Sequence, residues 1–339
     1  MTKKIFSFSS GKVSCYFDAS FENPERIFSH DNTIIITDEH IFTKHKRKFK
    51  NRKTIILQPG EQNKIQSTVD SIIQQLINLG ADRKTVLVGV GGGVVTDITG
   101  YVAGIYMRGI SFGFVPTTIL AMVDATIGGK NGIDAGVYKN MVGLIRQPSF
   151  ILYDYSFLKK LPREEWVNGF AEIIKHASIK DASLFSSLDS GSIQYYQKNM
   201  EELSSLVIRN VLLKAKAVAN DEFETGERKI LNFGHTIGHA IENLYGIPHG
   251  QAVAIGMVAA CKISTAINGF KDTDRVENLL KKYGLTPQMA FDKDNAFDIL
   301  LKDKKKVQDN IQYIALQKIG KAEIVKLSID KFHSLFTGL

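Results

Sequence analysis

Residues 85–97 read TVLVGVGGGVVTD, an apolar run that passes directly into three consecutive glycines. A short run rich in β-branched residues is typical of a strand buried on both faces, as in the centre of a parallel sheet. The glycines at 91–93 remove side chains where this strand ends and a helix begins, so backbone N–H groups can approach a pyrophosphate. The spacing of these glycines differs from the G-x-G-x-x-G pattern that is typical of dinucleotide-binding loops. The loop therefore indicates a phosphate-binding turn, with a plain strand-to-helix turn as the alternative.

The neighbouring segments extend this pattern. Strand-like runs occupy 33–37 and 54–57, and residues 64–79 carry helical periodicity that Gly80 ends. Strands that alternate with helices predict a doubly wound, nucleotide-type α/β domain with a parallel sheet. Beyond Asp154 the pattern is mostly helical. We therefore predict two domains, an α/β domain of nucleotide-binding type over 1–155 and a mostly α-helical C-terminal domain over 156–339, with the active site between them.

Charge is concentrated in one segment. The 339 residues carry a formal charge of +8, and seven of the lysines and arginines lie in KHKRKFKNRK at 44–53; without them the chain is close to neutral. This run is compatible with a nucleic-acid patch, but a solvated loop or short helix between two strands is favoured, and no nucleic-acid partner is predicted.

Two cysteines, Cys15 and Cys261, form neither a disulfide framework nor a CxxC metal motif. The N-terminus has no signal-peptide pattern, and no uninterrupted apolar run is long enough to span a bilayer. We expect a cytoplasmic protein without a membrane partner.

Histidines indicate a metal. His235 and His239 are four residues apart in LNFGHTIGH, so both face the same side of a helix, and His249 follows in a loop that can fold back. GFAEIIKH at 169–176 offers a carboxylate, a lysine and an imidazole on one helical face. Three N or O ligands with one open position are how a catalytic zinc is held. The alternative to a metal site is that His235 and His239 lie on an ordinary helix and bind no metal.

A second polar stretch follows the glycine loop. It contains PTT at 116–118, Asp124, GGK at 128–130 and the pair Lys139 and Asn140. Paired threonines, paired glycines and two lysines suit a phosphate-rich ligand, although any one lysine alone is more typical of a solvated surface.

The order of these motifs resembles the 3-dehydroquinate synthase family of the sugar-phosphate cyclase group, from about residue 38 to 323. The motifs that carry the resemblance are GEQNK at 60–64, GGGVVTD at 91–97, MRG at 107–109, PTT at 116–118, GGK at 128–130, KNMVG at 139–143, GFAEIIKH at 169–176, NDEFETGER at 220–228, LNFGHTIGHA at 231–240, HG at 249–250 and DKK at 303–305.

The resemblance implies specific residue roles. Zinc, or cobalt, would be held by Glu172, His235 and His249, and His239 would handle protons. NAD would contact Asp38, Gly60, Glu61, Gln62, Lys64, Gly91, Gly92, Gly93, Val94, Asp97, Thr117, Thr118, Lys130, Lys139, Phe157 and Lys160. Substrate would lie against Asp124, Lys130, Asn140, Lys175, Lys214, Arg228, Asn232 and Lys305. A homodimer is implied, in which Arg108 reaches the partner's active site.

The implied enzyme is a lyase of the shikimate pathway for aromatic amino-acid biosynthesis. It would convert 3-deoxy-D-arabino-heptulosonate 7-phosphate into 3-dehydroquinate and phosphate by oxidation, elimination, reduction and aldol closure, with NAD regenerated. The lysines and arginines suit a substrate with a phosphate and a carboxylate. Alternatives are a 2-deoxy-scyllo-inosose or valiolone-type cyclase, whose substrates lack the carboxylate, and a metal-dependent alcohol dehydrogenase of related architecture.

Overall fold

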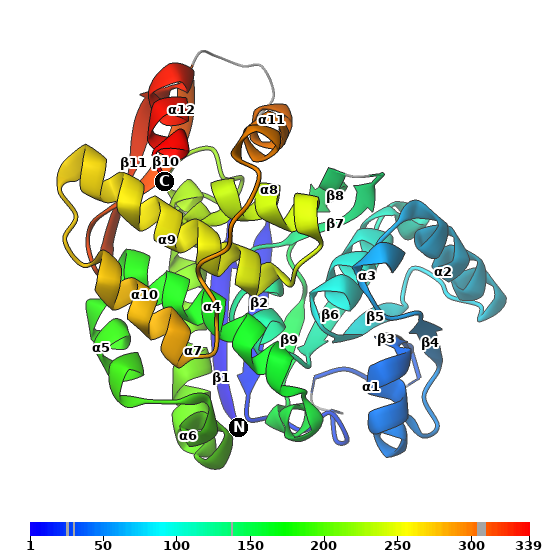
Figure 1. The fold of residues 1–339 in the computed structure, drawn as a ribbon. Coiled ribbons are helices and arrows are strands. Elements are labelled where there is room, and N and C mark those ends of the chain that lie inside the picture. The colour runs from blue at the N-terminus through cyan, green and yellow to red at the C-terminus, as the bar shows by residue number, and fades with distance from the viewer. Residues whose placement is uncertain (25–26, 30, 137, 304–309) are drawn as a thin grey trace. The chain divides into compact units, whose positions relative to one another are not determined.

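The computed structural model describes residues 1–24, 27–29, 31–136, 138–303 and 310–339 (Figure 1). Within them the chain forms two compact units. The first consists of residues 1–165 and 200–223, and the second of residues 166–199 and 224–339. The functional division into 1–155 and 156–339 stays a prediction.

The first unit is built on a seven-stranded sheet with the strand order β1-β2-β9-β6-β5-β3-β4. Only β1 runs antiparallel to its neighbour; the other paired strands are parallel. A separate antiparallel hairpin joins β7 and β8. The strand bounds are β1 Thr2–Phe8, β2 Gly11–Phe17, β3 Thr33–Asp38, β4 Thr54–Leu57, β5 Val86–Gly91, β6 Ser111–Pro116, β7 Lys130–Ala135, β8 Tyr138–Ile145 and β9 Phe150–Tyr153.

The central strand β5 is buried along nearly its whole length, as the sequence predicted. Gly89 is required there because a Cβ atom would lie 2.8 Å from the Thr99 hydroxyl of α3, so glycine lets this helix lie directly on the strand. Figure 1 shows α2 and α3 on one side of the sheet and α1 on the other. The helix bounds are α1 Glu39–Lys44, α2 Gln66–Asn78, α3 Gly93–Ile105 and α7 Met200–Asn220, with the short turns η1 Lys46–Phe49, η2 Glu61–Asn63, η3 Tyr106–Arg108, η4 Ala121–Ala125 and η5 Tyr155–Lys160.

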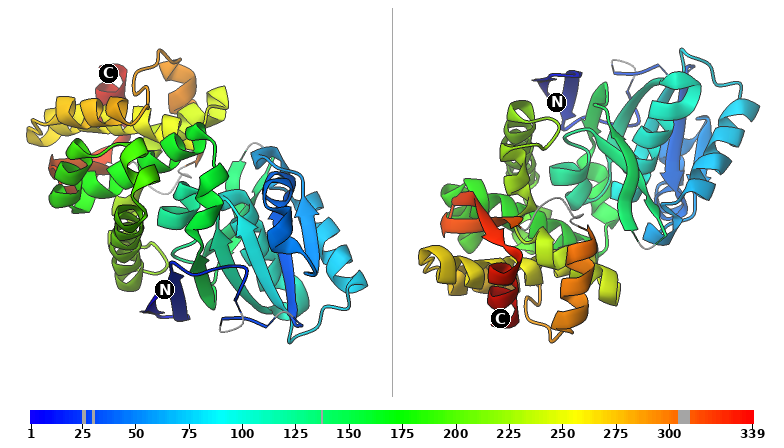
Figure 2. Two further views of the ribbon diagram at one scale, coloured as in Figure 1. Left: turned by 90° about the horizontal axis from the view of Figure 1, so that it is seen from below. Right: turned by 90° about the horizontal axis from the view of Figure 1, so that it is seen from above.

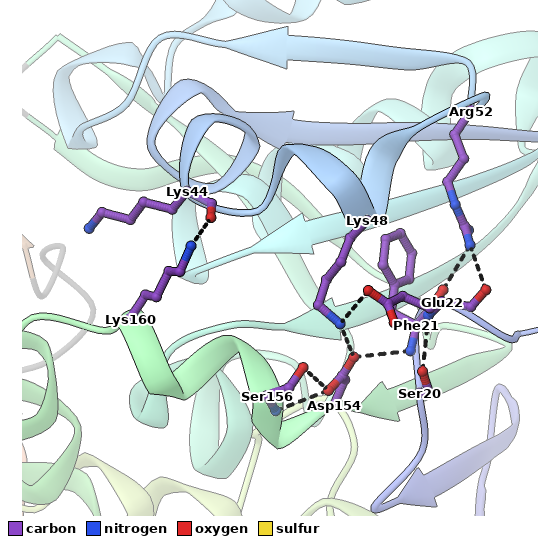
Figure 3. Close-up of polar contacts among 9 residues, drawn as sticks. All are labelled: Ser20, Phe21, Glu22, Lys44, Lys48, Arg52, Asp154, Ser156 and Lys160. Atoms are coloured by element: carbon purple, nitrogen blue, oxygen red, sulfur yellow. Dashed lines mark hydrogen bonds and ion pairs between the residues drawn. The ribbon is translucent and has the colours of Figure 1, made fainter.

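The basic run begins at the last residue of α1, continues through η1 and ends in the turn before β4, so it forms both a short helix and a loop between two strands. Two of its cations turn inward (Figure 3). Lys48 donates to Asp154 at 3.0 Å, and Arg52 donates to the Phe21 carbonyl at 2.8 Å while its guanidinium lies over the Phe21 ring. Asp154, which is 5% exposed, also accepts the backbone N–H groups of Phe21 and Ser156. These contacts tie the loop after β2 and the turn η5 to the basic run.

Replacement of Lys48 by methionine is expected to lower the free energy of unfolding by about 2 kcal/mol, because it leaves the buried Asp154 carboxylate without its cation. Urea unfolding monitored by circular dichroism measures the effect. Lys46→Met is the matched control, since Lys46 belongs to the same run but is exposed, and it should change stability by less than about 0.5 kcal/mol. Equal stability of the two variants would contradict a structural role for the Lys48–Asp154 pair.

The second unit is mostly helical, with one antiparallel hairpin, β10–β11, packed on α9 (Figures 1 and 2). Helix α9 has the length and hydropathy of a membrane-crossing segment, but most of it is buried inside the protein. The bounds are α4 Arg163–Lys180, α5 Ala182–Ser190, α6 Ile193–Lys198, η6 Glu227–Asn232, α8 His235–Tyr245, α9 His249–Asn268, α10 Thr273–Lys282, α11 Lys293–Asp303, β10 Asn310–Lys318, β11 Lys321–Ser328 and α12 Ile329–Thr337.

Candidate metal centre and nucleotide site

Three side chains of the second unit converge on one point. Glu172 comes from the middle of α4, His235 is the first residue of α8 and His249 is the first residue of α9. The Glu172 Oε1 atom lies 3.6 Å from His235 Nε2 and 3.5 Å from His249 Nε2. One ligand atom from each residue lies within 4.8 Å of the other two, which is close enough for a shared cation. His249 therefore reaches this point from a helix N-terminus, where the sequence had suggested a loop.

The other ring nitrogens are held by hydrogen-bond acceptors. His235 Nδ1 lies 3.1 Å from the Phe233 carbonyl oxygen, and His249 Nδ1 lies 3.1 Å from Glu242 Oε2. In the neutral ring, an Nδ1–H that donates to such an acceptor leaves the lone pair on Nε2, which is the arrangement of histidines that bind a metal. The donor set of two imidazole nitrogens and one carboxylate fits zinc or cobalt.

Glycines allow α8 and α9 to approach closely around these histidines. A Cβ atom on Gly238 would lie 2.9 Å from the Ala252 carbonyl oxygen. A Cβ atom on Gly250 would lie 2.3 Å from the Asn168 carbonyl oxygen, so the start of α9 fits against α4 only without a side chain there. The glycines beside His239 and His249 thus allow the close packing of the helices that carry the histidines.

The electrostatic environments of the two histidines differ. Burial, with a contribution from Lys175, keeps the pKa of His235 well below its ordinary value, so this ring favours the neutral form that binds metal. Burial also acts to lower the pKa of His249, but its hydrogen bonds with Glu172 and Glu242 outweigh burial and raise the pKa to about 9. The Lys175 ammonium forms an ion pair with Glu172, and both side chains are buried.

Other predicted residues of the second unit lie on α8 and in the turn η6. The rings of His235 and His239 are 5.0 Å apart on α8, which confirms the shared helical face. Arg228, in η6, is only 2% exposed, and Asn232 donates to Glu224 at 2.8 Å. Lys305 lies outside the described residues.

The glycine loop forms the turn from β5 to α3. Gly92 is the N-cap of α3 and has no side chain that could cap the first turn of this helix, so the N–H groups of that turn point toward the loop. The Thr117 backbone N–H donates to the Gly91 carbonyl at 3.0 Å. The Thr117 hydroxyl oxygen is buried, and no hydrogen-bond partner for it is found in the described part of the chain. A turn with uncapped N–H groups beside a buried hydroxyl fits a dinucleotide phosphate.

Three of the predicted residues meet at Lys64. Its ammonium is buried and lies 2.7 Å from Asp97 Oδ2 and 2.5 Å from Asn140 Oδ1. Glu61 lies farther away, at 3.8 Å. Burial alone would lower the pKa of Lys64, but Asp97 and Glu61 raise it, so this lysine stays charged. Asn140 adopts a left-handed conformation with φ of 52°, and its backbone N–H donates to Asp134. The cluster brings predicted NAD contacts together with a predicted substrate contact.

The remaining predicted residues of the first unit lie at several places. Lys214 donates to the Asp124 carbonyl and pairs with its carboxylate at 2.7 Å. Asp38 caps α1, and Lys160 donates to the Lys44 carbonyl. The Phe157 side chain is 1% exposed, within the aromatic core. Further positions are Gly60 and Gln62 at η2, Gly93, Val94 and Thr118 near the start of α3, Lys130 and Lys139 on the β7–β8 hairpin, and Arg108 in η3.

Sequence reasoning missed two groups of the metal centre, Glu242 and the Phe233 carbonyl. Glu242 is seven residues after His235, so the spacing of His235, His239 and Glu242 places all three on one face of α8. That periodicity could have identified the carboxylate. The carbonyl has no signal of its own in the sequence.

Family models and curated relatives match most of the chain and point to the same family. Residues 54–168 match the family model described as 3-dehydroquinate synthase N-terminal, and residues 169–306 match 3-dehydroquinate synthase C-terminal. The chain is 40% identical over 278 residues to the 3-dehydroquinate synthase of Thermodesulfovibrio yellowstonii, covering 80% of this chain and 77% of that protein. It is 40% identical over 274 residues to the one from Pyrococcus furiosus, covering 80% of each.

A solved structure has the same fold. The crystal structure of 2-deoxy-scyllo-inosose synthase, in complex with carbaglucose-6-phosphate, NAD+ and Co2+, superposes with a TM-score of 0.85 at 29% identity, over 99% of both chains. The predicted fold class, an α/β nucleotide-binding domain followed by a mostly helical domain, is thereby confirmed. The chain belongs to the 3-dehydroquinate synthase family.

Proposed function

We propose that this protein converts 3-deoxy-D-arabino-heptulosonate 7-phosphate into 3-dehydroquinate and phosphate, as a lyase of the shikimate pathway. The observation that carries the proposal is the convergence of Glu172, His235 and His249 inside a chain whose family match extends over residues 54–306. NAD and a divalent metal, zinc or cobalt, are the proposed cofactors, in keeping with the NAD+ and Co2+ of the similar cyclase.

The cofactors would supply a reversible hydride acceptor and a Lewis acid, respectively. Glu172, His235 and His249 would hold the metal through one carboxylate oxygen and two Nε2 atoms. The uncapped N-terminus of α3 and the Thr117 hydroxyl would bind the NAD pyrophosphate. Lys64 would hold the Asp97 carboxylate in place. Asn140, which also bonds to Lys64, would contact the phosphorylated substrate.

The substrate carries two anionic ends, and the chain offers separate cations for them. Arg228 and Lys214 are proposed for the carboxylate, because a buried guanidinium binds a planar carboxylate through two parallel hydrogen bonds. The proposed contacts of the substrate phosphate are Arg108, Asn140 and Lys305. Those of the substrate oxygens between the carboxylate and the phosphate are Lys130 and Lys175. Asp124, which pairs with Lys214, would fix the direction of that ammonium. Asn232 would donate to a substrate hydroxyl.

Incubation of the protein with the heptulosonate phosphate, zinc and a catalytic amount of NAD tests the proposal. Phosphate release should exceed the NAD present many times over, and NADH should not accumulate. Stoichiometric NADH would favour an alcohol dehydrogenase. Turnover of a hexose 6-phosphate, but not of the heptulosonate, would favour a cyclase of the 2-deoxy-scyllo-inosose type, which the structural similarity keeps as the second candidate.

Replacement of His239 by alanine is expected to leave zinc bound and to lower kcat by about a hundredfold or more, because this imidazole is proposed to move protons beside the metal and not to hold it. Its ring lies 6.0 Å from that of His249. Zinc content by atomic absorption and phosphate release by a coupled assay measure the two effects. Normal turnover by the variant would remove the proton-transfer role, and loss of zinc would make His239 a ligand.

A homodimer in the cytoplasm completes the proposal. Met107 and Arg108, both exposed in η3, have left-handed conformations with φ of 49° and 65°, which cost free energy outside glycine. Nearby on α3 and β8, Ile105, Met141 and Val142 are about 40% exposed, an apolar set suited to a second copy of the chain. Analytical ultracentrifugation tests the assembly, and a monomer at assay concentrations would contradict it.

A further inference from the structure

One buried carboxylate beside the metal centre has no role in the reaction as proposed above. Glu242 lies on α8 and is 7% exposed. Its Oε2 atom is 3.1 Å from Nδ1 of His249, across the turn that joins α8 to α9. A carboxylate at such low exposure is costly unless hydrogen-bonded donors compensate for its lost hydration. The His249 ring is one such donor, so the pair is energetically linked.

The backbone of Glu242 fixes the same turn. Its carbonyl accepts the N–H of Gly246, the left-handed residue that ends α8. Only Ile247 and Pro248 then separate this glycine from His249, the first residue of α9. The main chain of Glu242 therefore takes part in the end of α8. Its carboxylate holds the side chain of His249, the first residue of α9.

The hydrogen bond has a chemical consequence for His249. If Nδ1–H donates to the carboxylate, Nε2 carries the lone pair, and the ring plane is set so that Nε2 faces Glu172 Oε1 at 3.5 Å. An anionic acceptor also makes the imidazole a stronger donor to a cation. His235, by contrast, is held by the neutral Phe233 carbonyl. Among the residues that the structure describes, His249 is thus supported by a charged side chain and His235 by a main-chain carbonyl.

We propose that Glu242 is the positioning residue for His249: it selects the tautomer and fixes the ring so that Nε2 binds the metal. This rests on the proposed function, because it requires that Glu172, His235 and His249 hold a metal. Glu242 thereby tunes metal affinity without touching metal or substrate.

A competing interpretation is that Glu242 binds a cation itself. Ligand atoms of His239, Glu242 and His249 also lie within 4.8 Å of one another. A cation there would use His249 Nδ1, and His249 would then bridge two ions. We favour the hydrogen bond because a single Nδ1–H donated to Glu242 accounts for the 3.1 Å contact and leaves Nε2 available to the main site.

The test compares Glu242→Ala and Glu242→Gln with Asn243→Ala, which changes an exposed neighbour on the same helix. Each full-length protein is stripped of metal and titrated with zinc against a competing chelator. Alanine should weaken zinc binding by about 10- to 100-fold. Glutamine, which still accepts the Nδ1–H but lacks charge, should restore part of the affinity, and Asn243→Ala should match the unsubstituted protein. Cobalt absorption spectra of the same proteins should change for alanine and not for the control.

Four results would overturn the inference. Zinc affinity in Glu242→Ala equal to that of the control would show that His249 needs no such support. Two zinc ions bound per unsubstituted chain and one per Glu242→Ala chain would make Glu242 a ligand. Equal weakening by alanine and glutamine, with lowered thermal stability of both metal-free proteins, would indicate a purely structural role. Failure of the unsubstituted protein to bind zinc at all would refute the proposed function as well, which separates the two failures.

Discussion

Replacement of His235 by alanine is expected to lower kcat by at least about a thousandfold and to abolish tight zinc binding. The variant removes one of three proposed ligands, and a Lewis acid that stabilises charge in the transition state contributes several kcal/mol, of which about 4 kcal/mol corresponds to a thousandfold in rate. Alanine here creates no unpaired buried charge, whereas replacing Glu172 would leave the buried Lys175 without its carboxylate. Zinc content and phosphate release are measured on the same preparation.

His333→Gln is the matched control for this experiment, because His333 lies exposed on α12 of the same unit. It should keep full zinc content and full activity. Chelation followed by added zinc should restore the control but not His235→Ala. Stoichiometric zinc at unchanged affinity in His235→Ala, with near-normal turnover, would refute the proposed ligand set.

Replacement of Arg228 by lysine is expected to lower kcat/KM for the heptulosonate phosphate by about a hundredfold, even though the positive charge is kept. A guanidinium binds a carboxylate through two parallel N–H groups, and an ammonium in the same buried position cannot reproduce that geometry. The affinity for NAD, measured by calorimetry, should not change. Steady-state phosphate release at varied substrate concentration measures kcat and KM.

Lys229→Met provides the comparison for Arg228→Lys. Lys229 is the next residue, but its ammonium donates to Gln312 at 2.7 Å on the surface of the second unit. It should leave kcat/KM within about twofold, as expected for a surface substitution. If both variants reduce kcat/KM equally, the effect of Arg228 comes from general charge or folding, and its role at the carboxylate end of the substrate would have to be abandoned.

Much of the fold follows from local sequence pattern. The central strand, the glycine loop and the helix over 66–78 were predictable because burial on both faces and helical periodicity leave direct traces in the order of residues. Helices α5 and α6 were not predicted. Their sequences are rich in serine, tyrosine and glutamine, and their ends depend on side-chain caps from Asp181 and Ser192.

In the candidate site, the positions of residues on one helix were predictable, but contacts between separate elements were not. His235 and His239 share a helix, so their spacing alone placed them on one face. The inward direction of Lys48 and Arg52 could not be predicted, because their partners are 106 and 31 residues away along the chain. The same holds for the Glu242–His249 pair, which depends on the angle between two helices and not on the pattern within either one.

The division of the chain into units has a consequence for its synthesis. Residues 200–223 belong to the first unit although 34 residues of the second, 166–199, precede them. Within the first unit, α7 packs against η4 and β1 and supplies the buried Lys214 that bonds to Asp124. The ribosome therefore releases the N-terminal sheet long before the helix that covers part of it. A nascent chain stalled after residue 165 lacks this helix, and we expect the uncovered surface to bind chaperones and to make 1–165 a poor fragment for expression.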